Sequence, residues 1–270
     1  GIGLGAANYF LELGAKVTIC GRRESKIKAA TDSLGSNVLG LVGDVTVGSD
    51  RERLVEAAVR HGKGLDVLIN NAANMYRGAI TELDESELSD IFNSNVVAAM
   101  MLSGLCVPHL EKKKGSILFV GSVHNRRAFP GASPYAATKA AVQSLTQVLA
   151  AELGAKKIRV NCVVPGAVFT EINQRAGLFD DATAMARLQG MAGMHVLGRI
   201  GTEREIAEAM SYLICAKWTT GAIVDVDGGW EVRKGTLQGY SLHRRRRYEK
   251  RTRTVRIHEH GILQNLGIQR

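Results

Sequence analysis

Short apolar runs and longer amphipathic stretches alternate along most of the chain. The apolar runs are rich in Val, Ile and Leu, which is typical of strands buried on both faces of a parallel sheet. The stretches between them place apolar residues at helical spacing. This alternation predicts an α/β fold with a doubly wound, Rossmann-like parallel sheet in three layers. The expected strands are 16–20, 38–42, 67–70, 117–120, 158–164 and 223–226, and the expected helices are 24–34, 50–60, 85–110, 134–153 and 202–215.

The last of these helices has a recognisable start. Thr202 is followed three residues later by Glu205, just ahead of an apolar stretch. In this spacing the hydroxyl and the carboxylate can each bond the other residue's backbone N–H. We therefore expect a capping box to open the helix.

Ser122, Tyr135 and Lys139 carry the clearest chemical signal. Tyr135 and Lys139 are four residues apart on an expected helix, so they share one face. A nearby cation favours the phenolate and lowers a tyrosine pKa from about 10 toward neutral. Ser122 follows an apolar run, so its hydroxyl is expected at the carboxyl end of a strand, where open α/β sheets bind ligands. The trio predicts a proton donor acting on a carbonyl oxygen. The alternative is that Tyr135 and Lys139 have this spacing by chance and are a solvated pair on the helix surface.

Together with further segments, the trio resembles the short-chain dehydrogenase/reductase family, of the kind typified by bacterial 3-oxoacyl reductases and hydroxysteroid dehydrogenases. The resemblance covers residues 1–230. It implies an NAD(P)-dependent enzyme that interconverts a ketone and a secondary alcohol, most like a 3-oxoacyl thioester reductase, with steroid, retinoid or sugar dehydrogenases as alternatives. The matching segments are Gly1-Ile2-Gly3, Asp44-Val45, Asn70-Asn71-Ala72-Ala73, Asn95, Ser122, Tyr135, Lys139, and Pro165-Gly166 to Thr170.

The resemblance also implies a role for each site residue. Tyr135 would exchange a proton with the carbonyl, Lys139 would lower the tyrosine pKa and bind the nicotinamide ribose, and Ser122 would hydrogen-bond the carbonyl oxygen. Asn95 would anchor a water molecule or, alternatively, cap a helix irregularity. Residues 167–200, with weak periodicity, are expected to form a substrate lid. No metal site is expected, and the implied cofactor contacts are Gly1, Ile2, Gly3, Asp44, Val45, Asn71, Ala72, Tyr135, Lys139, Pro165, Gly166, Val168 and Thr170.

The residues after the first expected strand bear on cofactor choice. An acidic residue at this position binds the ribose of NAD, whereas arginine accommodates the 2′-phosphate of NADP. The chain has Arg22 and Arg23 here and no carboxylate at the strand end, which favours NADP over NAD. The alternative is that both are solvated charges, with Glu24 weakening their field.

Several basic residues could bear on substrate and partners. His124 could point into the pocket or be an ordinary loop residue, and Arg126 and Arg127 could meet an acidic substrate or be exposed charges. By resemblance, Lys113 and Lys156 match positions that dock an acidic acyl carrier protein, although lysines are common at helix ends in general. The resemblance also implies a homo-dimer or homo-tetramer.

The start of the chain departs from the family pattern. A glycine-rich phosphate loop normally follows a strand, which aims the loop at the pyrophosphate. No strand precedes Gly1-Ile2-Gly3. We therefore expect that the first strand of the sheet is missing and that the chain is a piece of a longer protein. The alternative is a short product whose neighbouring strands are left unpaired.

The basic charge of the chain lies in its last 40 residues. Residues 231–270 hold 11 of the 35 Lys and Arg and 3 of the 26 acidic residues, a net +8, which leaves residues 1–230 with 24 against 23. Blocks of like charge predict a disordered tail that can bind polyanions. We favour the simpler explanation that the tail is a translated frameshift or a retained noncoding stretch. A second class of function therefore stays open, a non-catalytic product that binds a partner or polyanion through this tail.

Cysteine usage and hydropathy suggest the setting. The four cysteines are far apart and lack the paired spacing of metal sites, so we expect buried thiols in a reducing, cytoplasmic compartment, although an organellar leader could be missing. No apolar run approaches the roughly 20 residues that span a bilayer. The expected organisation is one catalytic domain at 1–230 and a tail at 231–270.

Overall fold

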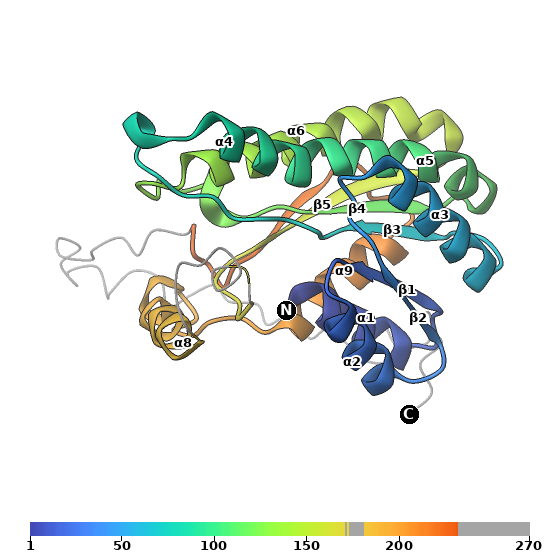
Figure 1. Ribbon diagram of the computed structural model, residues 1–270, viewed down its shortest axis with the longest axis horizontal. Coiled ribbons are helices and arrows are strands. Elements are labelled where there is room, and N and C mark those ends of the chain that lie inside the picture. The colour runs from blue at the N-terminus through green and yellow to red at the C-terminus, as the bar shows by residue number, and fades with distance from the viewer. Residues whose placement is uncertain (171, 173–180, 232–270) are drawn as a thin grey trace, which may run out of the picture. The chain divides into compact units, whose positions relative to one another are not determined.

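The computed structural model describes all residues except 171, 173–180 and 232–270 (Figure 1). The chain separates into two units, and the described residues all belong to the first, Gly1–Arg233. The predicted basic tail beyond Glu231 and nine positions of the predicted lid, 171 and 173–180, lie outside the described residues.

All six predicted strands are present, with ends that differ from the prediction by at most one residue. Each forms because a run of β-branched and aliphatic residues can be buried on both faces of a sheet. All strand pairs are parallel, with Val17 opposite Val38 and Ile117 opposite Val160. The strands are β1 (Val17–Gly21), β2 (Val38–Val42), β3 (Val67–Asn70), β4 (Ser116–Val120), β5 (Arg159–Pro165) and β6 (Ile223–Val226).

The parallel strands form two sheets instead of the single sheet that was predicted. β1 pairs with β2, and the second sheet has the order β3-β4-β5-β6. Within the described residues β1 and β3 each have a ladder partner on one side only, because no described segment supplies a strand between them. The expected Rossmann-like parallel α/β fold is confirmed, and a missing strand stays a prediction.

Helices cover both faces of the larger sheet. α5 and α6 lie on one face, with α3 and α4 beside them, and α9 lies on the other face against α1 (Figure 1). The helices are α1 (Ile2–Glu12), α2 (Glu24–Leu34), α3 (Gly48–Gly62), α4 (Glu85–Phe92), α5 (Ala98–Lys113), α6 (Ser133–Leu153), α8 (Asp181–Gly190) and α9 (Glu203–Cys215).

β4 shows how one strand serves two cores. Successive side chains of a strand point to opposite faces. Ile117 and Phe119 enter the core under α5 and α6, whereas Leu118 and Val120 enter the core under α9. Every residue of β4 is buried, which explains the continuous apolar run that follows Ser116.

The helix predicted at 85–110 is interrupted. A π-helical turn at Asn93–Val97 separates α4 from α5. The continuous run Glu85–Lys113 is, by length and mean hydropathy of 1.5, the one helix in the described part of the chain that could cross a membrane. It packs against α3, α6 and β3, and core helices of α/β proteins meet the same criterion.

Candidate active site

The predicted trio meets at the carboxyl end of β4. Ser122 follows β4 directly, and α6 begins at Ser133, so Tyr135 and Lys139 lie in its first two turns. All three residues are buried. Lys139 Nζ donates to the carbonyl oxygen of Val120 at 2.8 Å and lies 5.6 Å from the centroid of the Tyr135 ring. The bond to Val120 is the one hydrogen bond of the Lys139 side chain in the described part of the chain. It leaves two N–H donors of the ammonium for a ligand.

Burial dominates the electrostatics of this pair. It raises the pKa of Tyr135 to about 12, against the opposing effects of a hydrogen bond with Ser122 and of the Arg77 charge. It also lowers the pKa of Lys139 to about 8. Desolvation of the phenolate outweighs both the Ser122 hydrogen bond and the Arg77 charge, and a lowering of the tyrosine pKa by Lys139 stays a prediction. Tyr135 is therefore a phenol that stays protonated at neutral pH.

Asn95 lies in the π-helical turn and joins three segments. Its amide oxygen accepts from the Asn74 N–H at 2.7 Å and from Ser94 Oγ at 3.0 Å. Its Nδ2 donates to Asn74 O at 3.0 Å and to Thr138 Oγ1 at 3.1 Å. These four bonds use the full capacity of the side-chain amide. The geometry therefore favours the alternative role, a polar group at a helix irregularity, over a side chain that anchors water.

The N-terminus of α1 meets residues from two other loops. A Cβ on Gly3 would lie 2.5 Å from Asn71 Nδ2, and one on Gly1 would lie 3.4 Å from Thr170 Cβ. Gly3 is therefore needed for this close approach. The first turn of α1 has no acidic residue, and helix N-termini offer free N–H groups and a positive dipole end to phosphates. This arrangement fits the pyrophosphate of a dinucleotide.

Arg22 and Asp44 meet where β1 and β2 end. Arg22 Nη1 lies 3.7 Å from Asp44 Oδ2, and the Arg22 side chain is 60% exposed. The other Asp44 oxygen accepts from the N–H and hydroxyl of Thr46 at 2.9 and 2.8 Å, which holds the carboxylate in place. Asp44 was expected as a cofactor contact, but its pairing with Arg22 was not predicted, because the two residues follow different, neighbouring strands. Arg23 is the N-cap residue of α2, and Val45 belongs to the turn after β2.

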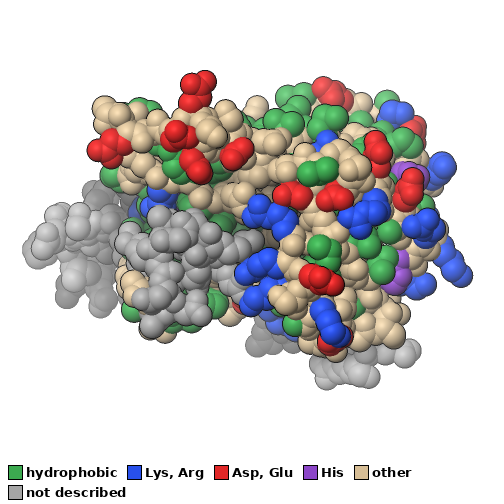
Figure 2. Space-filling view, in the orientation of Figure 1, with side chains coloured by type: hydrophobic (Ala, Val, Ile, Leu, Met, Phe, Trp, Pro, Cys, Tyr) green, Lys and Arg blue, Asp and Glu red, His purple; other side chains and the backbone are tan. Residues whose placement is uncertain are grey.

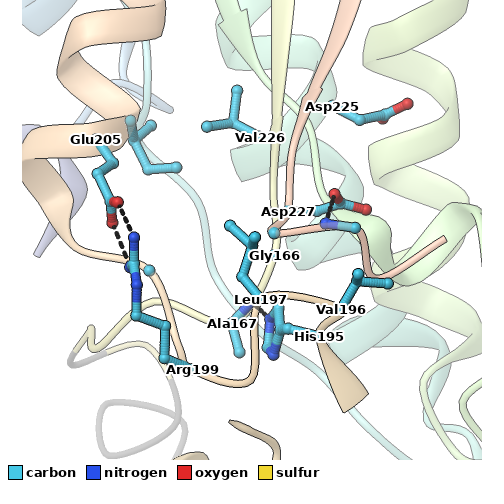
Figure 3. A pocket seen from close by; sticks show the side chains of 14 residues that line it. Gly166, Ala167, His195, Val196, Leu197, Arg199, Glu205, Asp225, Val226 and Asp227 are labelled. Atoms are coloured by element: carbon cyan, nitrogen blue, oxygen red, sulfur yellow. Dashed lines mark hydrogen bonds and ion pairs between the residues drawn. The ribbon is translucent and has the colours of Figure 1, made fainter. Parts of the chain in front are cut away.

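The motif at 165–170 borders a cavity of about 390 Å³. His195 is buried beside it, with Nε2 accepting from the Ala167 N–H at 3.2 Å and Nδ1 3.1 Å from Met191 O (Figure 3). A Cβ on Gly166 would lie 2.8 Å from Asp227 Cα, so this glycine is needed. Val168 forms a parallel bridge with Gly201. These contacts tie the motif to the segment 191–201.

The loop after β4 brings His124 into the site. His124 Nδ1 lies 3.0 Å from Ser122 Oγ, and Arg77 Nη2 lies 3.1 Å from His124 Nε2. Arg126 is directed elsewhere: its Nε lies 3.5 Å from Asp225 and 3.2 Å from Glu231. Sequence reasoning missed Arg77 and His195, since an isolated basic residue in a loop carries no periodic or motif signal.

Charged side chains elsewhere have local partners. Acidic side chains gather over α4, whereas basic ones are spread over the part formed by β1, β2 and their helices (Figure 2). Lys156 Nζ bonds Glu111 at 2.8 Å. Cys106 and Cys162 are buried as expected, but Cys20 is only partly buried and Cys215 is exposed, because it ends α9 at the surface. No group of His, Cys, Asp or Glu in the described residues has the arrangement of a metal site.

Known proteins share the sequence and the fold. The chain matches, over residues 1–231, the family model described as enoyl-(acyl carrier protein) reductase. Dehydrogenase/reductase SDR family member 4 of Sus scrofa is 36% identical over 236 residues, which are 85% of this chain and 83% of that protein. 3-Oxoacyl-[acyl-carrier-protein] reductase FabG of Chlamydia muridarum is 32% identical over 236 residues, 85% of this chain and 92% of that protein.

A solved structure shows the same arrangement. The 3-ketoacyl-(acyl-carrier-protein) reductase from Brucella melitensis, complexed with NADH, superposes with a TM-score of 0.77 at 29% identity, covering 86% of this chain and 94% of that one. The family match extends over the described sheets, over the loop that carries Ser122 and over α6, which carries Tyr135 and Lys139. The chain belongs to the short-chain dehydrogenase/reductase family of oxidoreductases.

Proposed function

We propose that the protein reduces a ketone to a secondary alcohol with NADPH, and that the ketone is a 3-oxoacyl thioester. The observation that carries this proposal is the buried Tyr135 phenol beside the Ser122 hydroxyl, with Lys139 behind them. Two adjacent hydroxyl donors suit an oxygen atom that gains negative charge. Two relatives are named as 3-oxoacyl or 3-ketoacyl reductases, which supports the thioester. Steroids, retinoids and sugars remain the alternative substrates.

Tyr135, Ser122 and Lys139 each have a separate role in the proton transfer. A bound nicotinamide cofactor supplies the hydride. Tyr135 donates its proton to the carbonyl oxygen, which its raised pKa permits across neutral pH. Ser122 donates a hydrogen bond to the same oxygen. Lys139 stabilises the phenolate that forms, and its two remaining N–H groups can hold the cofactor ribose.

The choice of NADP rests on Arg22 and Arg23. An exposed guanidinium at the end of β1 can meet a 2′-phosphate. Asp44 beside Arg22 opposes this by repelling the phosphate, although its pairing with Arg22 also orients that arginine. The structure of the Brucella melitensis relative contains NADH. It supports a nicotinamide dinucleotide as the cofactor, and the preference for NADP over NAD is the further part of the proposal.

Self-association is supported by an apolar strip on the π-helical turn, α5 and α6. Four of its side chains are about half exposed, which is unusual for large apolar residues grouped on neighbouring helices. We infer a homo-dimer or tetramer through this face. The strip comprises Val97, Met100, Met101 and Val148.

We also propose that an acidic acyl carrier protein docks at Lys113 and Lys156. Lys156 already pairs with Glu111.

The decisive experiment follows NADPH oxidation with a panel of 3-oxoacyl thioesters, steroids and simple ketones. We expect turnover with at least one thioester. Tyr135→Phe should lower kcat by about 10²- to 10⁴-fold because the proton donor is lost, while NADPH binding measured by fluorescence stays near that of the parent. A folded protein that turns over no ketone, or an equally active Tyr135→Phe variant, would refute the proposal. Binding of a polyanion by the tail and a cytoplasmic location stay predictions.

A further inference from the structure

A chain of four side chains leads into the site from a loop that sequence reasoning did not connect to it. Arg77 lies in the loop after β3 and contacts His124, which contacts Ser122, which in turn contacts Tyr135. The imidazole is held by rings on two sides. It stacks on Phe129 with centroids 4.3 Å apart and meets the Tyr135 ring edge-on at 5.1 Å.

Arginine decides which nitrogen of His124 carries the proton. A guanidinium only donates hydrogen bonds, so Nε2, at 3.1 Å from Arg77 Nη2, must be the accepting nitrogen. A neutral imidazole then has its proton on Nδ1. Nδ1–H therefore donates to Ser122 Oγ, at 3.0 Å.

The Ser122 hydroxyl is oriented in consequence. Its oxygen accepts from His124 Nδ1–H and also from the His124 backbone N–H at 3.3 Å. Two accepted bonds use both lone pairs, so the hydroxyl proton must point elsewhere. The Ser122 hydroxyl lowers the pKa of Tyr135, which indicates that this proton is directed toward the phenol. With the opposite tautomer, Nδ1 would accept the hydroxyl proton and Ser122 could not donate toward Tyr135.

We infer that Arg77 and His124 are positioning residues, which lock the imidazole as the Nδ1–H tautomer and so present the Ser122 hydroxyl as a hydrogen-bond donor to the reacting oxygen. The tautomer follows from the contacts alone, and its catalytic consequence rests on the proposed function. Neither residue needs to touch the substrate for this effect.

The charges around His124 keep it neutral. Burial, then the cations of Arg77 and Lys139, lower its pKa to about 4. The groups that face it are Arg77 from the loop after β3 and Tyr135 and Lys139 from α6. Imidazole protonation thus leaves no mark on the pH profile of the parent enzyme near pH 6.5, the ordinary histidine pKa.

The first test is independent of activity. Nitrogen-15 spectra of histidine-labelled parent protein, with His124→Asn used for assignment, should show His124 as the Nδ1–H tautomer throughout the neutral range. In Arg77→Met the tautomers should mix and the imidazole should titrate closer to about pH 6.5, because the donor and its charge are gone. A parent His124 protonated on Nε2 would overturn the inference, even if the protein proves an active reductase.

The second test separates positioning from structural support. Arg77→Met should lower kcat for ketone reduction by about 10- to 100-fold at neutral pH with KM for NADPH unchanged. As pH falls below about 6.5, kcat should recover, because the imidazole, whose pKa burial and Lys139 still hold below its ordinary value, takes up a proton on Nδ1. His124→Phe keeps the ring but should show no such recovery, and His124→Asn, whose amide can donate to Ser122, should retain more activity than His124→Phe. Arg60→Met, which removes an exposed guanidinium from the last turn of α3, is the matched control.

Each outcome of the second test is decisive. Recovery of Arg77→Met at acidic pH supports the inference. An Arg77→Met profile parallel to that of the parent, or a His124→Phe variant with full kcat, would refute it. If the parent itself is inactive, the proposed function fails, and the nitrogen-15 spectra still decide the tautomer.

Discussion

Tyr135 and Lys139 are both removed from water, and their proton affinities shift in opposite directions as a result. The lysine titrates near pH 8 and the tyrosine near pH 12. Each group is therefore held in its neutral form more firmly than in water. A neutral phenol at pH 7 is the form that a reduction needs.

The depressed lysine pKa predicts a pH dependence. Reduction should be fastest below about pH 8 and slow as Lys139 loses its proton, since the cation near the ring stabilises the phenolate that forms. Oxidation of the alcohol needs the Tyr135 phenolate, so it should speed up only as pH rises toward about 12, the pKa of the phenol. Measuring kcat/KM in both directions across pH checks this, with Lys139→Met expected to remove the step. A reduction rate that stays flat well above pH 8 would argue against Lys139 as the titrating group.

The charges after β1 and β2 predict cofactor preference. Arg22→Ala combined with Arg23→Ala should raise KM for NADPH far more than KM for NADH, because a charge-assisted phosphate contact is lost. Asp44→Asn should act in the opposite direction and lower KM for NADPH, since the carboxylate lies 3.7 Å from Arg22. Lys28→Ala on α2 is a control, because that lysine pairs with Asp32 at the surface. Equal increases in KM for NADPH and for NADH would show that Arg22 and Arg23 do not bind the 2′-phosphate.

At the level of elements, α9 carries the clearest local signal. The predicted capping box is confirmed: Thr202 Oγ1 accepts from the Glu205 N–H at 3.3 Å, and a Glu205 oxygen accepts from the Thr202 N–H at 2.9 Å. Hydrogen bonds from Arg199, then from the Thr202 N–H, lower the pKa of Glu205 to about 2. α9 buries Ile206, Met210 and other apolar residues against β4 and β5, so its first turn anchors one face of the sheet.

Removal of this cap should weaken the domain measurably. Thr202→Ala should cost about 1 kcal/mol of unfolding free energy at neutral pH. Glu205 has a depressed folded-state pKa, so its contribution is present above its ordinary pKa and is lost as pH falls toward about 2. The difference between Glu205→Gln and the parent in urea unfolding should therefore shrink in acid. Glu208→Gln, on the exposed side of α9, should change little at either pH, and an equal loss in that variant would contradict the role of the cap.

At the level of the whole molecule, the two sheets differ in how they are buried. Every residue of β4 is buried and β5 is buried except at Arg159, whereas β1 and β2 contain no fully buried residue and α2 buries none. β1 and β3 are not joined by ladder hydrogen bonds. The region from β1 to β2 therefore depends on fewer apolar contacts than the rest of the domain.

This difference predicts a region of low local stability. Native-state hydrogen exchange should show weaker protection of amides in residues 17–42 than in β4 and β5. Saturating NADPH should raise protection in residues 17–42, because the proposed cofactor contacts come from both sheets. A chain ending at Arg233, the last residue of the first unit, should show the same pattern. Uniform protection of all six strands would contradict the prediction.

Local pattern alone determined much of this protein. The alternation of apolar runs and helical stretches placed six strands to within a residue, because burial on both faces leaves a continuous apolar signal. The capping box could be predicted because Thr202 and Glu205 lie within one helical turn of each other. The i, i+4 spacing of Tyr135 and Lys139 likewise placed them on one helical face. The α8 helix was missed because its segment has weak periodicity.

Contacts between distant segments were decided only by the tertiary structure. Asp44 lies beside Arg22 because β1 and β2 are neighbours, and Arg77 reaches His124 because the loops after β3 and β4 end at one sheet edge. The Tyr135 pKa could not be inferred from the lysine spacing, since desolvation depends on the whole fold that surrounds the phenol. Sequence shows which groups are near in the chain, whereas burial and cross-strand proximity are properties of the packed molecule.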